Sequence, residues 1–229
     1  MKKINENGRS MVEMLGVLAN IGVLSVGGIA GYSKAMNKYK INKTTDQVSM
    51  LVANIRTLFS SQGNYGDLSN AKAITFGVVP NDMYKSGEGA DGKTITNAFG
   101  GNVTILAAKA RAGDDSSNEA FVIEYSGLSS EACVTVSTGD WGSGQASGLV
   151  GMAAGVQEAA GTDADVGTIG GLISADVIID GDVSEAKAGS VIAQPGGDYP
   201  TPIKVTDAVT ACSGADNAGS GYAVAWKYF

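Results

Sequence analysis

The first part of the chain is dominated by one long apolar run that follows a short polar start. Residues 1–9 read MKKINENGR, and between Met14 and Tyr32 only Asn20 and Ser25 are clearly polar. As a helix this run is about 28 Å long, which is close to the thickness of the hydrocarbon core of a bilayer. The positive residues in front of it predict a cytoplasmic N-terminus and an outward C-terminus.

A secretory signal peptide is the alternative interpretation of this run. Such a peptide carries a small-residue cleavage site after its apolar region. Here the sequence continues as GGIAGYSKAMNKYK without an obvious break. We therefore expect the apolar region to be retained in the protein.

The apolar pattern then changes from continuous to periodic. The next apolar positions recur at spacings of three, four and seven, which indicates one face of an amphipathic helix. The pattern fades at SSQGNYGDLS and predicts one helix from about residue 10 to about residue 61, about 78 Å long. Its first half must lie in lipid or among other copies of itself, and its second half must pack on the following domain. The periodic positions are Ile41, Val48, Leu51, Val52, Ile55, Leu58 and Phe59.

After residue 62 short apolar runs alternate with turn residues, which is typical of strands. Two short helices are also expected, one within residues 128–138 capped by Ser129 or Ser130, and one at residues 148–160. In the last run Tyr222, Val224, Trp226 and Tyr228 fall on one face of a strand. The predicted fold class is α+β, a long helix packed on an antiparallel sheet. The predicted strands are 74–79, 102–108, 120–126, 172–180 and 221–229.

Composition excludes several classes of function. The chain has 229 residues, a formal charge of −7 and no histidine. Serine or cysteine catalysis with a histidine base is therefore excluded, and so are histidine-ligated zinc sites. A nucleic-acid-binding surface would be basic, so no nucleic-acid partner is predicted. No phosphate-binding loop or hydrolase elbow is present, and we expect neither enzymatic activity nor a cofactor.

The remaining candidate residues are two cysteines, several acidic turns and two tryptophans. In an exported chain Cys133 and Cys212 predict one disulfide, the alternative being two buried free thiols. Acidic residues at 163–165 and 180–185 have spacings that can surround calcium, but neither stretch is a complete EF-hand loop, so no metal site is predicted. Trp141 and Trp226 are expected in the core or at subunit contacts rather than on an adhesive surface.

One stretch has a more specific pattern. In GRSMVEMLGVLA a short basic leader ends in Gly8, and Glu13 lies five residues later at the edge of the apolar run. This resembles the class III signal of type IV prepilins, and most closely the type IVb pilin family. The resemblance implies cleavage between Gly8 and Arg9 by prepilin peptidase, followed by N-methylation of Arg9. It also implies that the Glu13 carboxylate meets the new α-amino group of a neighbouring subunit and sets assembly register. Arg9 stands where the family usually has an apolar residue.

The resemblance extends into the remainder of the chain. ITNAFGGNVTI, residues 95–105, is similar to the type IVb segment with Asn-Pro-Phe-Gly-Gly, and has Ala98 in place of proline. LSSEACVTV, followed by Trp141 and then Cys212, resembles the family's disulfide-bounded C-terminal region. The fold implied is the pilin αβ-roll.

The resemblance divides the chain into four parts. Residues 1–8 are expected to be a cleaved cytoplasmic leader, 9–36 the membrane and filament-core helix, 37–62 its amphipathic half, and 63–229 the globular head. The implied function is a structural subunit of a type IV pilus, a homo-oligomeric helical filament. The alternative is a minor pilin or a secretion-system pseudopilin acting in priming or adhesion. Prepilin peptidase and an inner-membrane assembly platform are the implied partners, with the chain in the inner membrane before assembly and in the extracellular pilus afterwards.

Overall fold

The computed structural model describes residues 11–66, 68–86, 93–108, 118–142, 147–156, 190–193, 201–213 and 221–229. The chain divides into two compact units, Met1–Lys40 and Ile41–Phe229. The predicted strand 172–180 lies outside the described residues. The elements are α1 (Met11–Phe59), α2 (Asn70–Thr75), η1 (Asn81–Met83), β1 (Tyr84–Ser86), β2 (Lys93–Ile95), β3 (Val103–Ala108), β4 (Ala120–Leu128), α3 (Ser130–Ser137), β5 (Leu149–Val156), β6 (Ser190–Ala193), α5 (Val205–Ala211) and β7 (Tyr222–Tyr228).

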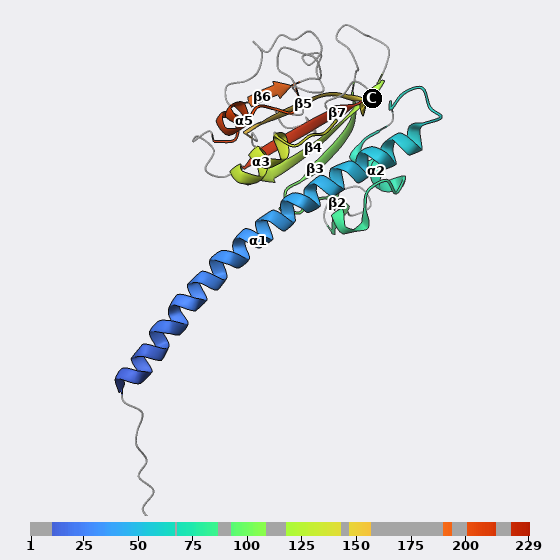
Figure 1. The fold of residues 1–229 in the computed structure, drawn as a ribbon. Helices are drawn as coiled ribbons and strands as arrows, with labels where there is room; N and C mark the ends of the chain where they lie inside the picture. The colour runs from blue at the N-terminus through green and yellow to red at the C-terminus, as the bar shows by residue number, and fades with distance from the viewer. Residues whose placement is uncertain are drawn as a thin grey trace, which may run out of the picture. The chain divides into compact units, whose positions relative to one another are not determined.

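The second unit is built on a five-stranded sheet with the order β3-β4-β7-β5-β6. Each neighbouring pair is antiparallel. The strand that comes last in sequence, β7, therefore lies at the centre, between β4 and β5 (Figure 1). Trp226 shows this position directly, because it pairs with Ile123 of β4 on one side and with Met152 of β5 on the other. A separate two-stranded sheet is formed by β1 and β2.

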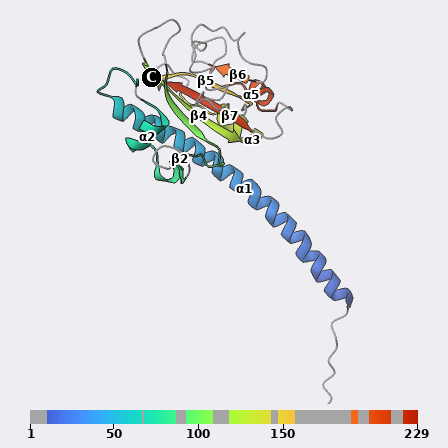
Figure 2. The same ribbon diagram turned by 180° about the vertical axis from the view of Figure 1, so that it is seen from behind.

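The C-terminal part of α1 packs on this sheet. Figures 1 and 2 show it running along the strands, with α2 and β2 beside it. Its buried side chains lie on one face, which confirms the amphipathic stripe predicted from the sequence except at Leu58, which is 37% exposed. At the end of the helix Phe59 contacts Tyr65, and Tyr65 contacts Phe121 of β4, with ring centroids 5.2 and 4.9 Å apart. The fold class is therefore α+β, a long helix packed on an antiparallel sheet. The buried apolar residues of the stripe are Ile41, Val48, Leu51, Val52, Ile55 and Phe59.

Three predicted strands and one predicted helix are confirmed. The strands correspond to β3, β4 and β7, and the helix to α3. The Ser129 hydroxyl caps α3 by accepting a hydrogen bond from the Ala132 N–H at 3.3 Å. In β7 the predicted face is also confirmed, because Val224, Trp226 and Tyr228 are all buried in the main core and Tyr222 packs against it.

The opposite face of β7 is buried as well. Ala223 and Ala225 belong to a second, smaller apolar cluster with Val122 of β4 and Ala153 of β5. The sheet therefore has an aromatic-rich core on one face and an alanine-rich core on the other. Alternation of side chains along β7 places Trp226 and Tyr228 in the first core and Ala223 and Ala225 in the second.

The helix predicted at residues 148–160 is wrong where the structure describes it. Leu149–Val156 is the strand β5, which lies between β7 and β6. Alanine-rich sequence favours a helix when it is exposed. Here the small residues pack in the sheet instead, with Ala153 opposite Ala225 and Ala154 opposite Val224. Tertiary packing has overridden the local preference of the sequence.

The strand predicted at residues 74–79 is also wrong. Its first residues end the short helix α2, which Ser69 caps by accepting a hydrogen bond from the Lys72 N–H at 3.4 Å. The chain then turns at Gly77, which has a φ of 69°. Asn70 fixes the helix to β3, because its side-chain N–H donates to the Val103 carbonyl and its oxygen accepts from the Ile105 N–H.

Candidate functional site

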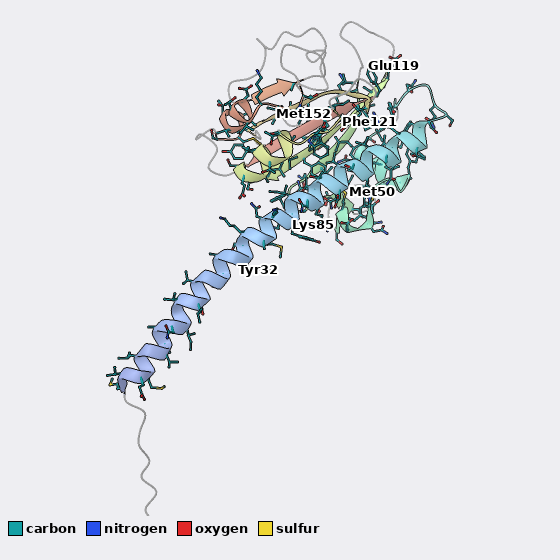
Figure 3. All side chains as sticks on the ribbon, viewed as in Figure 1. Tyr32, Met50, Lys85, Glu119, Phe121 and Met152 are labelled. Atoms are coloured by element: carbon teal, nitrogen blue, oxygen red, sulfur yellow. A yellow bond between two sulfur atoms is a disulfide. The ribbon has the colours of Figure 1, made fainter. Side chains whose placement is uncertain are left out.

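The N-terminal part of α1 is a long exposed apolar surface. Among the described residues, α1 is the one helix long and apolar enough to cross a membrane, and none of its most apolar stretch is buried. It therefore differs from the core helix of a globular protein, which is mostly buried. Tyr32, labelled in Figure 3, closes the apolar run and is 66% exposed. The other exposed large apolar side chains of this stretch are Met11, Val12, Met14, Leu15, Val17, Leu18, Ile21, Val23, Leu24, Val26 and Ile29.

Glu13 is the acidic residue in the first turn of α1. A carboxylate there interacts favourably with the N-terminal end of the helix dipole. The structure thus brings Glu13 onto the same exposed helix as the apolar run. Gly8 and Arg9, the predicted cleavage pair, lie outside the described residues, so the structure does not describe their relation to Glu13.

The exposed part of α1 contains five glycines. A Cβ atom added at any of them meets nothing within 4 Å, so no contact within the described chain requires their small size. Asn20 is likewise exposed. The glycines are Gly16, Gly22, Gly27, Gly28 and Gly31.

A disulfide joins two short helices of the head. Cys133 belongs to α3 and Cys212 follows α5 as its C-cap residue. Their Cα atoms are 5.9 Å apart, although 79 positions separate them in the sequence. Both are fully buried. The disulfide therefore connects α3 to the region immediately before β7.

The two tryptophans lie together in the head. Trp226 is fully buried, and its ring centroid is 4.8 Å from that of the half-buried Trp141. The indole N–H of Trp141 donates a hydrogen bond to the Val136 carbonyl at 2.7 Å. Both rings thus have packing partners within the chain, as expected for core residues rather than an adhesive surface.

The ITNAFGG segment forms a tight loop against β4. The side-chain oxygen of Asn97 accepts hydrogen bonds from the Phe99 and Gly101 N–H groups, at 2.9 and 3.1 Å. Its side-chain N–H donates to the Ser126 carbonyl at 2.7 Å. A Cβ on Gly101 would lie only 2.9 Å from the Gly127 Cα, so the two backbones pack in direct contact. Sequence reasoning noted this motif but assigned no role to Asn97 or Gly101. The available signal was an asparagine three residues before a Gly-Gly pair.

Arg56 of α1 binds the end of β7. Its Nε donates a hydrogen bond to the Phe229 carbonyl at 2.8 Å, and its guanidinium lies 5.1 Å from the centre of the Tyr228 ring. Burial raises the pKa of Tyr228 to about 12, and the nearby Arg56 charge opposes this shift. Sequence reasoning also missed Arg56, because nothing in its local pattern distinguishes it from a solvated charge.

A second polar contact fastens η1 to α1. The Lys43 ammonium is 3.0 Å from the Asp82 carboxylate, and the Gln47 side-chain N–H donates to the same carboxylate at 3.3 Å. The hydrogen bond from Lys43 is the main cause that lowers the pKa of Asp82. Within the described ranges, no group of three or more cysteine or acidic side chains is placed to hold a metal ion. The acidic turns at 163–165 and 180–185 lie outside those ranges.

Comparison with known proteins identifies the relatives of this chain. A family described as PilS N terminal matches residues 38–175. The chain is 28% identical over 140 residues to the major structural subunit of bundle-forming pilus from Escherichia coli O127:H6, covering 60% of this chain and 67% of that protein. It is 26% identical over 137 residues to the toxin coregulated pilin of Vibrio cholerae serotype O1, covering 60% of this chain and 59% of that one.

Two solved structures are also similar. One is the type IV b pilin from Salmonella typhi, with a TM-score of 0.47 and 18% identity, covering 82% of this chain and 97% of that one. The other is TcpA, a type IV pilin from Vibrio cholerae El Tor, with a TM-score of 0.49 and 18% identity, covering 83% and 99%.

Proposed function

Because this chain belongs to the PilS N-terminal family of type IV pilins, we propose that it is the structural subunit of a type IV pilus. The observation that carries the proposal is the family match over residues 38–175, which includes the amphipathic part of α1 and much of the head. Its relatives include a major structural subunit of a pilus and a pilin. This supports a bulk subunit of the filament rather than a minor pilin or a secretion-system pseudopilin.

Before assembly the chain is held in the inner membrane by the apolar part of α1. Support comes from the length of this stretch and from its complete exposure in the isolated chain. Apolar side chains that find no partner within their own chain are stabilised by lipid or by other apolar surfaces. The N-terminus faces the cytoplasm and the head lies outside.

Prepilin peptidase then cleaves between Gly8 and Arg9 and methylates the new terminus at Arg9. Cleavage creates an α-amino group a few residues before Glu13. A carboxylate in hydrocarbon costs roughly 2.5–3.5 kcal/mol on insertion scales unless it is paired. The α-amino group of a neighbouring subunit relieves this cost in only one stagger between helices, so the pair sets register.

In the filament, residues 9–36 form a central bundle and the heads face outward. The inner-membrane assembly platform adds subunits one by one. Head-to-tail contacts between identical subunits produce an open helical filament rather than a closed ring. The chain acts as a building block and carries out no catalysis.

The test is the intact mass and N-terminal sequence of the protein in filaments sheared from cells. We expect a chain that begins at Arg9, with the added mass of one methyl group, as the main component of the sheared fraction. In a Gly8→Val strain we expect the uncleaved chain in the membrane and none in the sheared fraction.

Gly63→Val is the matched control. It makes the same change in the head, where an added Cβ meets nothing within 4 Å, and should leave processing and export intact. A sheared protein that still begins at Met1, or that is cut after Tyr32, would overturn the proposal. The apolar stretch would then be a simple anchor or an ordinary signal peptide.

A further inference from the structure

The end of the apolar run carries a second feature that pilus assembly does not explain. Tyr32, Lys34, Lys38 and Tyr39, here called the cuff, follow the run directly, and all four are exposed. Tyr32 and Tyr39 are 66% and 60% exposed. We propose that the cuff binds the anionic phospholipid headgroups of the outward leaflet while the subunit waits in the membrane, an inference that rests on the membrane stage proposed above.

The cuff lies at the correct depth for this role. A helix rises 1.5 Å per residue, so Tyr32 lies about 27 Å beyond Met14, close to one hydrocarbon thickness. Tyrosine is enriched at this boundary because its ring is apolar and its hydroxyl is polar. Lysine extends its apolar stem along the lipid and places its ammonium group among the headgroups.

The arrangement of the cuff around the helix fits a crossing helix. Tyr32 and Tyr39 are seven residues apart and share one face, and Lys34 and Lys38 are four apart and share another. At 100° per residue the two faces are about 130° apart around the helix. A helix lying flat on a membrane would have its charges on one side and its apolar residues on the other. Because the tyrosines and the lysines of the cuff lie on different sides of the helix, they suit a helix that crosses the membrane and is surrounded by headgroups.

The positive charge of the segment around the cuff indicates that it binds anionic rather than neutral lipids. Residues 14–45 contain four lysines and no acidic residue. Orientation in the membrane does not require these lysines, because basic residues on the outward flank oppose the positive-inside rule rather than support it. A basic segment beside a membrane attracts anionic lipid, and this attraction falls off within one Debye length.

The test uses the full chain reconstituted in phosphatidylcholine vesicles containing a trace of spin-labelled lipid. Electron paramagnetic resonance measures the fraction of labelled lipid immobilised around the protein, for phosphatidylglycerol and for phosphatidylcholine in turn. We expect phosphatidylglycerol to be preferred on the order of threefold at low salt, with the preference approaching one in 1 M NaCl. In the Lys34→Gln/Lys38→Gln variant the preference at low salt should fall clearly below that of the parent, and the part that remains comes from the other basic residues beside the apolar run.

Lys72→Gln/Lys85→Gln is the matched control, since it removes the same charge from exposed positions of the head and should retain the preference. Equal immobilisation of the two lipids, or an unchanged preference in the cuff variant, would overturn the inference. The inference also fails if the cuff variant keeps its lipid preference but no longer forms filaments. The two lysines would then bind an acidic surface of a second copy rather than lipid. An absence of any immobilised lipid would instead contradict the proposed membrane stage.

Discussion

Replacing Gly101 by alanine should open the contact between the ITNAFGG loop and β4. The added Cβ would lie 2.6 Å from the carbonyl carbon of Ser126 and 2.9 Å from the Gly127 Cα. Both are backbone atoms in or beside a paired strand, so no flexible side chain can move to make room. The loop must shift, and the buried hydrogen bond from Asn97 to the Ser126 carbonyl lengthens or breaks.

The cost follows from these two effects. Forcing an extra methyl group into a packed interior costs about 1–3 kcal/mol. Leaving a buried polar group without its partner costs about 1–3 kcal/mol. Because the two effects share the same movement, we expect a loss of about 2–4 kcal/mol in the free energy of unfolding. For a head of this size that corresponds to a fall in melting temperature of roughly 4–16 °C.

The assay is thermal unfolding of the purified chain in detergent, followed by near-ultraviolet circular dichroism of the buried aromatic side chains. Gly63→Ala is the control, because a Cβ there meets nothing within 4 Å, and we expect its melting temperature to stay within about 1–2 °C of the parent. If Gly101→Ala melts with the control, the loop does not depend on direct backbone contact with β4, and the packing argument fails.

Two further predictions concern covalent and charged contacts. Replacing both Cys133 and Cys212 by alanine should lower the free energy of unfolding by about 4 kcal/mol in the chain-entropy model, because the closed loop spans 79 positions. Reduction of the parent should give the same melting temperature as the double variant, and an unchanged melting temperature would contradict this. Asp82→Asn should reduce stability by less than about 1 kcal/mol at pH 6, because the Asp82 side chain is 49% exposed. Since the pKa of Asp82 is lowered on folding, its contribution is present above the unfolded value of about 3.9 and disappears as the pH falls through the lower folded value. The difference between the parent and Asp82→Asn melting temperatures should therefore narrow progressively as the pH falls below about 3.9, and a difference that widens there would refute the sign.

The sequence predicted the elements whose patterns are long or strongly periodic. The α1 stripe is visible because apolar residues recur with the helical period over several turns. The face of β7 is visible because large aromatic and small residues alternate along the strand. The α3 helix is visible through its serine cap, which has a local chemical cause.

The elements and contacts that could not be predicted from the sequence depend on partners that are distant along the chain. Half of the residues of the β5 strand are glycine or alanine. The reason for that composition is the alanine-rich face of β7 opposite Ala153, far away in sequence. The α2 helix depends on Asn70 reaching the backbone of β3, which no local pattern reveals. Arg56 was missed likewise, because its hydrogen-bond partner, the Phe229 carbonyl, lies 173 positions away.

The central place of β7 has a consequence for the timing of folding. The two strands that flank β7, β4 and β5, both come before it in the chain. The edge of β5 that β7 covers therefore stays unpaired until residues 222–228 are present. As the chain is synthesised from its N-terminus, β3 and β4 can form a hairpin early, whereas β4 presents an open edge until β7 has been made. The head therefore completes its sheet only when its last strand is available, and its folding includes a late, long-range step of the kind that is intrinsically slow. A frameshift or stop codon just before residue 222 would remove the middle of the sheet rather than trim its edge.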